Sequence, residues 1–436
     1  MKPYASYKPS GVPWLGDVPS HWRVMPIRYL SRGVKTGGTP SQEAFVDELS
    51  EGAIPWYAPA DLRNLYLTDS SRIVATEFSS DVDVFDVGTI ALVGIGDVGR
   101  VAMLSVEGTG NQQLNFIRPV EGVLSKYLTY AFMAGQEFVR SRANVTLIPI
   151  LNQESTKRLP FVIPDLDEQQ AIVDYLDVET ARIDTLIHEK DELTGFLKEW
   201  RQTVIVEAVT KGVDKTATFA SHPDPWIGLY PTHWTTKKLK YLGMFRAGAG
   251  FPVELQGQMG NPLPFFKVKD IDGANENGVI RESDSTVTPE TALSLGAKVF
   301  PPHAIVFAKV GAALLLNRFR LLGSESCIDN NMMGFVLHQE IANHRFMFWA
   351  MQRINFSEIV NPGTVPSLNE PLISNLHIAV PLLSEQQAIA DYLDAETAKI
   401  DDLIAHTHDE ITLLKELRAA TIADAVLGRV DVRTKN

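Results

Sequence analysis

Only one cysteine, Cys327, occurs in this sequence of 436 residues. The chain therefore cannot form an intramolecular disulfide and has no cysteine-based zinc cluster, which agrees with a reducing compartment. We expect Cys327 to be a small buried hydrophobic side chain rather than a reactive thiol.

The sequence also lacks any apolar run long enough to cross a bilayer. Its first residues, MKPYASYKPSGVPW, lack the apolar stretch of a signal peptide. We therefore predict no membrane segment and a cytoplasmic location. With 45% hydrophobic residues, a chain of this length is expected to form two or more cores.

Motifs of known enzymes are missing as well, including the GxSxG elbow, HExxH and a Walker loop. Gly94-Ile-Gly96-Asp-Val-Gly99 matches the dinucleotide-binding pattern, but the residues after it read as a second strand. Since the phosphate cradle needs a helix N-terminus, a hairpin turn is the better interpretation. We expect no catalytic residue and no metal site in this chain, and we interpret His188, His406 and His408 as solvated positions.

Net positive charge is also absent: the formal net charge is −13, and it is unevenly distributed. Residues 165–214 contain 5 basic and 13 acidic side chains, and residues 382–436 contain 6 and 11. Residues 1–164 contain 15 and 16, and residues 215–381 contain 14 and 13. The two larger segments are therefore near neutral, and their binding to phosphates alone would be modest.

What the sequence does contain is a repeat. EQQAIVDYLDVETARIDTLI at 168–187 returns at 385–404 as EQQAIADYLDAETAKIDDLI, with 16 of 20 residues identical. PWLGDVPSHWRVMPIRYL from Pro13 is echoed by PWIGLYPTHWTTKKLKYL from Pro225. The sequences between these repeated motifs are far less alike. The chain therefore contains two copies of the same set of motifs, with different sequences between them. We predict four segments, with bounds 1–163, 164–213, 214–380 and 381–436.

Each acidic segment predicts a long helix. Apolar residues recur there at alternating intervals of four and three, a heptad spacing that needs a partner helix. The first helix is expected from Glu168 to about Lys211, on the order of 60 Å. Asp167 with Gln170, and Ser384 with Gln387, have the spacing of a capping box. The simplest partner for each helix is the other copy, in an antiparallel coiled coil. On pattern alone, a dimer zipper or a solvated charged bundle stays open.

The residues expected in the contact between the helices form one apolar stripe. They are Ile172, Leu176, Ile183, Leu186, Leu197, Ile389, Leu393, Ile400, Leu403 and Leu414, and the stripe continues through Leu193, Trp200 and Leu417.

The divergent segments predict an α+β fold in each half. Short β-like runs alternate with Gly, Pro and Asp turns, and helical stretches cover residues 126–142 and 342–358. A faint echo persists, because Pro55-Trp-Tyr with Asp61 resembles Pro264-Phe-Phe with Asp270. The prediction is two tandem α/β domains joined by two long helices, with an internal pseudo-twofold repeat.

Polar side chains gather in the loops of both divergent segments. Arg and Lys suit guanine edges and phosphates, and Asn and Gln suit adenine edges, although ordinary solvated surface is the simpler interpretation of any one residue. The candidates for DNA contact are Lys35, Thr36, Thr39, Arg63, Gln112, Gln113, Arg142 and Asn144 in the first half, and Arg246, Lys267, Lys269, Lys309, Asn330 and Asn331 in the second.

These residues together resemble a known family. Gly11-Val-Pro-Trp-Leu-Gly-Asp-Val-Pro-Ser-His-Trp22, its partial copy ending at Trp234, and the paired Pro-x-x-x-Glu-Gln-Gln-Ala-Ile helix starts are similar to the specificity subunit of type I restriction-modification enzymes. The resemblance covers the whole chain, including the order of its parts.

The resemblance implies a non-catalytic subunit with two target recognition domains, each reading one half of a bipartite, asymmetric target in double-stranded DNA. The long helices would act as a ruler for the spacer between the halves. The repeated regions would dock two methyltransferase subunits, and restriction subunits with motor and nuclease activity would join for cleavage. S-adenosylmethionine is expected in the methyltransferase subunits, and no cofactor in this chain.

Two other function classes stay open at this point. The chain could be a scaffold that uses its coiled coil for assembly and its domains to bind proteins, which the near-neutral domains favour. It could also be a self-contained nucleotide-binding enzyme, an idea that rests on Gly94 to Gly99 alone.

Overall fold

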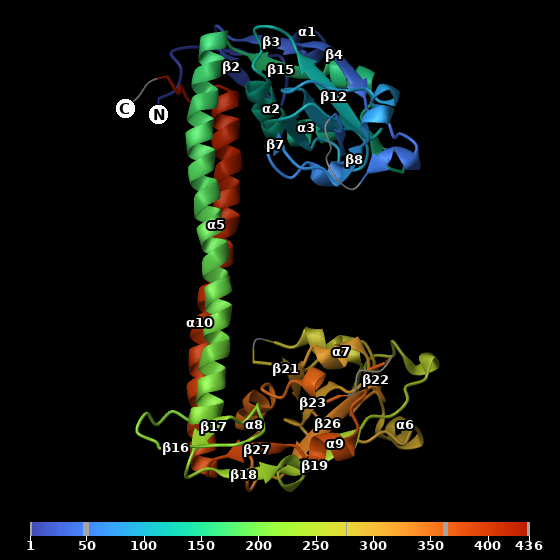
Figure 1. Ribbon diagram of the computed structural model, residues 1–436, viewed down its shortest axis with the longest axis vertical. Helices are drawn as coiled ribbons and strands as arrows, with labels where there is room; N and C mark the ends of the chain where they lie inside the picture. The colour runs from blue at the N-terminus through green and yellow to red at the C-terminus, as the bar shows by residue number, and fades with distance from the viewer. Residues whose placement is uncertain (1, 47–51, 146, 276, 361–364, 434–436) are drawn as a thin grey trace. The chain divides into compact units, whose positions relative to one another are not determined.

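The structure is a computed structural model that describes residues 2–46, 52–145, 147–275, 277–360 and 365–433 (Figure 1). The chain divides into two compact units: unit 1 is Met1–Asp191 with Asp409–Asn436, and unit 2 is Glu192–His408. In each unit we call the part outside the two long helices the head. Head 1 lies before residue 166 and after residue 426, and head 2 lies between residues 211 and 383.

Head 1 is built on two sheets. The five-stranded sheet has the order β4-β12-β9-β10-β7, in which only β7 runs parallel to its neighbour. Its strands are β4 (Ser31–Thr36), β12 (Leu114–Pro119), β9 (Ile90–Val93), β10 (Val101–Leu104) and β7 (Tyr66–Leu67). A second sheet contains β11 (Thr109–Gly110), β6 (Ile54–Tyr57), β8 (Arg72–Val74) and β5 (Phe45–Val46). Every residue of β9 and β10 is buried, so these strands form the centre of the head.

The other elements of head 1 are short strand pairs and helices. The pairs are β1 (Tyr7–Pro9) with β2 (Asp17–Pro19), β3 (Arg23–Pro26) with β15 (Pro160–Ile163), and β13 (Asn144–Val145) with β14 (Pro149–Ile150). The helices are α1 (Ile27–Leu30), η1 (Gln42–Ala44), η2 (Pro59–Asp61), η3 (Thr76–Asp81), α2 (Ser125–Ala134), α3 (Gln136–Ser141) and α4 (Gln153–Arg158). The predicted helix at 126–142 is therefore interrupted at Gly135, where a Cβ would lie 2.9 Å from the Trp14 ring.

Head 2 repeats this arrangement with a different sequence. Its five-stranded sheet has the order β19 (Gly243–Ala247), β26 (Met332–Leu337), β23 (Ile305–Ala308), β24 (Phe319–Leu322) and β21 (Val279–Ile280). A second sheet contains β22 (Thr286–Val287), β20 (Leu263–Phe266) and β25 (Cys327–Ile328), and two pairs join β16 (Phe219–Ser221) to β17 (Leu229–Pro231) and β18 (Thr235–Lys238) to β27 (His377–Val380). The helices are η4 (Leu239–Tyr241), η5 (Val253–Leu255), η6 (Val268–Gly273), α6 (Pro289–Ser294), α7 (Ala312–Leu315), α8 (His344–Met351), η7 (Phe356–Glu358) and α9 (Glu370–Ser374). The expected pair of α+β domains with one fold is confirmed.

The glycine pattern at 94–99 is a hairpin turn, as predicted. It connects β9 to β10, which pair antiparallel with Leu92 opposite Val101. Gly96 and Gly99 have φ of 88° and 97°, a region in which side chains are strained. No helix follows these glycines, so the cradle for a dinucleotide is missing there.

The two long helices are α5 (Leu166–Lys211) and α10 (Leu383–Val426) (Figure 1). In unit 1 they run antiparallel, because Asp184 pairs with Arg418 while Lys190 pairs with Glu410. Antiparallel pairing was expected and is confirmed. Within the described residues no helix is both long and apolar enough to cross a membrane.

The predicted capping boxes are wrong. In α5 the cap is Asp165, whose Oδ1 accepts from the Glu168 backbone N–H at 2.9 Å. Gln170 and Gln387 instead bond along the helix to Asp174 and Asp391, both at 2.7 Å. A serine or aspartate three residues before a glutamine has the capping spacing, but each helix begins before Asp167 or Ser384 is reached.

Four predicted stripe residues hold the long helices to the heads. Ile172 and Leu176 lie in the core of head 1 together with Ile422 and Val426 from the end of α10. Ile389 and Leu393 lie in the core of head 2, next to Ile205 and Val209 from the end of α5. Each head is therefore closed by the start of one long helix and the end of the other.

The residues buried between the two long helices keep the predicted heptad spacing. In part of the stripe, however, they lie one residue away from the predicted positions. Ile183, Leu197 and Ile400 are buried as predicted, and Leu186 and Leu414 are half-buried. Leu403 is 49% exposed, and Leu193, Trp200 and Leu417 are also exposed, so their assignment to the contact is wrong. Buried threonines occupy contact positions instead, namely Thr180, Thr194, Thr397 and Thr407. The pattern misled because those positions are polar by residue type, and three of these hydroxyls donate to the carbonyl four residues earlier.

Candidate nucleic-acid interface

Several predicted residues of head 1 meet at one corner of its five-stranded sheet. Lys35 and Thr36 end β4, and Gln112 and Gln113 precede β12, the strand beside it. Gly37 makes this approach possible, because a Cβ there would lie 2.1 Å from the Gly110 carbonyl oxygen. We call these residues, with Thr39, corner 1.

The side chains of corner 1 differ in how available they are. Lys35 is exposed and pairs with Asp83, and Thr39 donates to Gln112 through its hydroxyl. The hydroxyl of half-buried Thr36 donates to Asn115 Oδ1 at 2.8 Å and contacts Gln153 at 2.9 Å. Thr36 therefore stabilises the corner, whereas Lys35 and Gln112 present polar groups to solvent.

Head 2 has the same corner with other side chains. Arg246 lies in β19, Asn330 and Asn331 precede β26, and Lys309 follows β23. The Lys309 backbone N–H donates to the Asn331 carbonyl at 2.8 Å, as Gly94 donates to Gln113 at 2.7 Å in head 1. We call these four residues corner 2.

A glycine again permits the close approach in corner 2. A Cβ on Gly248 would lie 2.1 Å from the Asp329 carbonyl oxygen, the distance found at Gly37 in corner 1. The sequence-based candidates in the two halves are thus structural counterparts, although the prediction selected them separately.

Three candidates of head 1 lie on other segments. Arg63 follows η2 and its Nε donates to the Ala60 carbonyl at 2.9 Å. The guanidinium of Arg142 stacks 5.0 Å from the Phe138 ring, and Asn144 begins β13. They are exposed, but the described contacts do not join them to corner 1.

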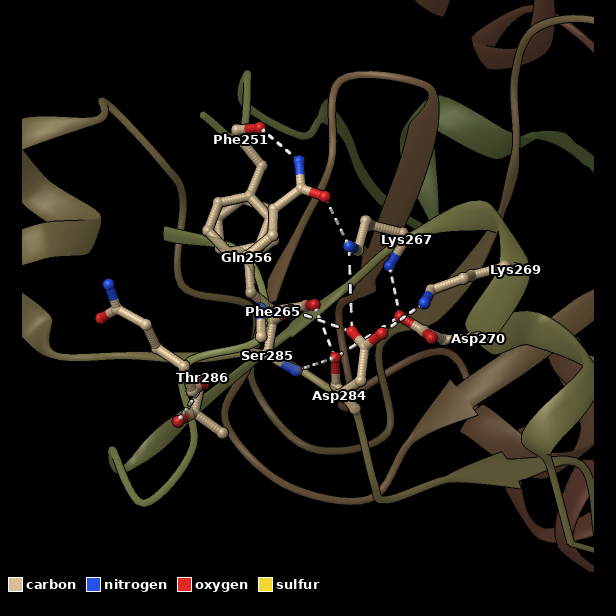
Figure 2. Close-up of polar contacts among 12 residues, drawn as sticks. Phe251, Gln256, Phe265, Lys267, Lys269, Asp270, Asp284, Ser285 and Thr286 are labelled. Carbon is tan, nitrogen blue, oxygen red and sulfur yellow. Dashed lines mark hydrogen bonds and ion pairs between the residues drawn. The ribbon is translucent and has the colours of Figure 1, made fainter. Parts of the chain in front are cut away.

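Lys267 and Lys269 form a separate cluster with Asp284 in head 2 (Figure 2). Lys269 Nζ bonds Asp284 Oδ2, and Lys267 Nζ lies 3.8 Å from Oδ1 of the same carboxylate. Lys267 also donates to Gln256 Oε1 at 3.0 Å and lies over the Phe251 ring, which stacks on Phe265. The hydrogen bond from Lys269 lowers the pKa of Asp284 and raises that of Lys269, so both charges are kept at neutral pH.

The turn of head 1 that corresponds to the Lys267 turn has the same backbone hydrogen bond but different side chains around it. The Ala58 N–H donates to Asp61 Oδ2 at 2.8 Å, as the Lys267 N–H donates to Asp270 Oδ2 at 2.7 Å. This explains the echo of Asp61 and Asp270 in the sequence, since both carboxylates cap the same turn. Arg72, which no motif indicated, supplies the cation here by stacking 4.9 Å from the Phe45 ring.

The repeated Glu-Gln-Gln motif is a joint between each head and its long helix. Glu168 is buried, and its Oε2 lies 2.8 Å from His21 Nε2. Glu385 Oε2 lies 3.0 Å from His233 Nε2, and its Oε1 accepts from Trp234 Nε1 at 3.0 Å. The histidine of one repeated motif is therefore the partner of the glutamate in the other, and in head 2 Trp234 bonds the same glutamate.

The first glutamine of the motif closes the same joint. Gln169 Nε2 donates to the Gly122 and Pro164 carbonyls, both at 3.1 Å, and its Oε1 accepts from the Leu124 N–H. Gln386 makes the matching bonds to the Ile341 and Pro381 carbonyls, both at 3.0 Å, and to the Asn343 N–H.

An aspartate two turns along each helix completes the joint. Asp177 accepts from Lys126 at 2.6 Å and Tyr130 at 3.0 Å on α2. Asp394 accepts from Arg345 Nε at 2.9 Å and Trp349 at 3.0 Å on α8. The near-identical sequence thus fixes each head to a helix, while the corners differ.

Comparison with known proteins shows the family to which the chain belongs. The model of the family "Type I restriction modification DNA specificity domain" matches residues 19–194 and 231–413. The type I restriction enzyme MjaIX specificity subunit of Methanocaldococcus jannaschii is 25% identical over 438 residues, covering 96% of this chain and 95% of that protein. The MjaVIII specificity subunit of the same organism is 22% identical, with the same coverage.

Solved structures show the same fold. One, described as the structural basis of complex assembly and conformational transition of the type I R-M system, has a TM-score of 0.74 at 15% identity and covers 95% of this chain and 99% of that chain. The HsdS subunit from Thermoanaerobacter tengcongensis has a TM-score of 0.55 at 15% identity, with coverage of 95% and 98%. With the family match extending over most of the chain, this protein belongs to the type I restriction modification DNA specificity domain family and carries that domain twice.

Proposed function

We propose that this chain is the DNA-reading specificity subunit of a type I restriction-modification complex, and that each head reads one half of a bipartite target. The observation that carries the proposal is that corner 1 and corner 2 share a backbone but not side chains. Corner 1 offers Lys35 and Gln112, and corner 2 offers Arg246 and Asn330. Arg and Lys bond guanine edges, and Gln and Asn bond adenine edges, so two such corners on one frame suit an asymmetric target.

The role of the chain in this complex is recognition rather than catalysis. The matching family is described as a DNA specificity domain. Methyl transfer would belong to partner methyltransferase subunits that bind S-adenosylmethionine, and cleavage to restriction subunits. The near-neutral heads agree with such a division, because partner subunits could supply much of the contact with phosphates.

A repeated exposed surface favours two copies of the same partner. In unit 2, Phe196 and Trp200 of α5 are exposed, and in unit 1 their counterparts Leu413 and Leu417 of α10 are exposed too. Large apolar side chains one helical turn apart on a solvent-facing surface are typical of protein interfaces. Since each pair lies 217 positions from its counterpart, one methyltransferase subunit would dock on each.

The long helices would set the spacer between the half-targets. Each head is fixed to both long helices through its core, and the Glu168 and Glu385 joints add hydrogen bonds to that attachment. If the heads cannot turn freely on the helices, the separation of the half-targets would follow the length of the coiled coil.

The alternative is a scaffold whose heads bind proteins, which the low charge of the heads would suit. Membership of a DNA specificity family weighs against it. The discriminating experiment is to co-express this chain with a methyltransferase subunit that forms a complex with it in a methylation-free host, and to map modified adenines across the genome. A gapped, two-part motif would support DNA reading. A stable, active complex with no modified motif would favour the scaffold.

Exchange of residues 31–146 for the same region of a relative then tests the modular reading. The exchange should alter one half of the motif and leave the other unchanged. A change in both halves would contradict independent reading by two heads.

A further inference from the structure

We propose that His222, Asp224 and His377 of head 2 form a binding site for a divalent transition metal of the zinc class. No metal site was expected from the sequence, in which His377 lies far from the other two residues. The fold brings them together where the β16–β17 connection passes the start of β27.

The geometry of the three side chains fits one small ion. One ligand atom from each residue lies within 4.8 Å of the others. Asp224 Oδ2 is 3.3 Å from His377 Nδ1 and 3.6 Å from His222 Nδ1. A tetrahedral ion with bonds of about 2.0–2.2 Å places its ligand atoms about 3.3–3.6 Å apart, so both separations match.

The chemistry of the ligands indicates the class of ion. Two imidazoles with one carboxylate suit Zn²⁺, Co²⁺ or Ni²⁺, whereas Mg²⁺ and Ca²⁺ prefer oxygen ligands. All three side chains are partly exposed, at 17% for His222, 27% for Asp224 and 37% for His377, so an ion in solution can reach them. A fourth ligand would be water.

Two existing hydrogen bonds must yield to the metal, one of them between His377 Nδ1 and Asp224 Oδ2 at 3.3 Å. His222 Nδ1 accepts from the Asp224 backbone N–H at 3.1 Å. An ion must displace both partners, so metal binding competes with these two hydrogen bonds.

Head 1 provides an internal comparison, because its matching strands lack all three ligands. Ser10 stands at the place of His222 and Val12 at that of Asp224, between β1 and β2. Pro160 begins β15, as His377 begins β27. Ser10 keeps the local turn, since its Oγ accepts from the Val12 N–H at 3.1 Å. The turn therefore needs no histidine, and the histidines and aspartate of head 2 are an addition to it.

A bound ion would tie together two segments that join head 2 to the long helices. The connection after α5 reaches β17 through His222 and Asp224, and β27 leads into α10. Trp226 Nε1 already donates to the His377 carbonyl at 2.8 Å across the same contact. The metal would add bonds across it and stabilise head 2 relative to its unfolded state.

The test uses the full chain, stripped with a chelator and titrated with Zn²⁺ alone by isothermal titration calorimetry. We expect one equivalent to bind, and His377→Ala and His222→Ala each to weaken binding at least roughly tenfold. His406→Ala, which removes an exposed histidine on α10 outside the cluster, is the matched control and should bind as the unaltered chain does.

A second measurement keeps the proposal testable if a variant folds poorly. Co²⁺ added to the unaltered chain should give the intense visible absorption of a four-coordinate site, and one equivalent of Zn²⁺ should abolish it. Weak absorption typical of six-coordinate Co²⁺, or Zn²⁺ binding that His377→Ala and His222→Ala leave unchanged, would overturn the proposal.

Discussion

Arg418 holds Asp184 through two hydrogen bonds in unit 1, from Nε at 2.8 Å and from Nη2 at 3.1 Å. In unit 2, Arg201 holds Asp401 in the same way, at 2.8 and 3.0 Å. Each residue lies 217 positions from its counterpart, and the helix that supplies the arginine changes from α10 to α5. The repeat therefore preserves pairs of residues that are distant in sequence.

Replacing Arg418 with Ala should destabilise unit 1 modestly. The pair is bidentate but partly exposed, so we expect a loss of about 0.5–1 kcal/mol in the free energy of unfolding. Arg201→Ala should have a similar effect in unit 2. Urea unfolding of Arg418→Ala, Asp184→Asn and the double variant measures the coupling between the two side chains. Additive effects of the two changes would show that the pair does not contribute.

Removal of Glu168 should cost more than removal of Glu385. Glu168 is buried against His21 and lies 3.6 Å from Arg433, whereas the Glu385 side chain is 22% exposed. Removing a buried charge leaves its partners uncompensated, so Glu168→Ala should lose about 2–4 kcal/mol, and Glu385→Ala about 1 kcal/mol. Thermal unfolding of both variants gives the order. Equal losses would mean that burial does not distinguish the two joints.

Asp284→Asn should make DNA binding by the assembled complex more dependent on salt. The carboxylate neutralises one of the charges of Lys267 and Lys269 (Figure 2), and its loss frees about one more cation for phosphate. The slope of log affinity against log salt should steepen by about 1. Lys269→Ala removes a cation instead, and as a control it should make the slope of log affinity against log salt less steep. Titrations of a labelled duplex at several salt concentrations measure both. An unchanged slope in both variants would place this cluster away from DNA.

Cys327 should report the unfolding of head 2. It is buried in β25 as predicted, and burial raises its pKa to about 11. At pH 8 the thiolate population is then about a hundredfold below that of the unfolded chain, so a thiol reagent should label the native protein correspondingly slowly. Ser324→Cys in a Cys327→Ser background puts a thiol at an exposed position nearby and should label rapidly.

The same thiol has a defined effect on stability at high pH. Because its folded pKa is raised, the stabilisation is fully present below the unfolded pKa of about 9 and is lost as pH rises through about 11. The Cys327→Ser chain should lack this part of the loss of stability at alkaline pH. Fast labelling of native Cys327 at pH 8 would contradict its burial.

Lengthening the coiled coil should lengthen the DNA spacer, as the ruler proposal requires. One heptad inserted after Asp191 in α5 and another after His408 in α10 add about 10 Å, or about three base pairs. Methylation mapping should find both half-targets unchanged with a longer gap. Insertion in α5 alone breaks the register and is expected to abolish modification. The original gap in the double insertion would exclude the ruler.

Sequence reasoning succeeded where the signal was local. Heptad spacing placed the first long helix from Glu168 to about Lys211, and the structure places it from Leu166 to Lys211. The buried strands β9 and β10 were recognisable from short apolar runs. The seam was misassigned at Leu403 because its neighbours Thr397 and Thr407 are polar by type although buried in fact.

The site could be predicted only in part, because it depends on strand order. Lys35 and Gln112 come together since β4 pairs with β12, and no local pattern shows that pairing. The contact of Lys269 in η6 with Asp284, and that of His222 with His377 at the start of β27, likewise join separate segments of the chain. Thr36 was selected for its polarity, yet its hydroxyl is used within the corner.

The Glu168 joint of head 1 and the Glu385 joint of head 2 differ in how the neighbouring chain segments are connected. In head 1, the segment beyond α10 and the segment before β1 meet through the Asp431 N–H and the Lys2 carbonyl at 2.9 Å. In head 2 the matching path, from Gly212 to β16, is a continuous peptide. A hydrogen bond can open without breaking the chain whereas a peptide bond cannot, so the segment that brings Arg433 to Glu168 can separate from the segment before β1 while the duplicate path in head 2 stays joined. Local opening at this place is therefore available to head 1 and not to head 2.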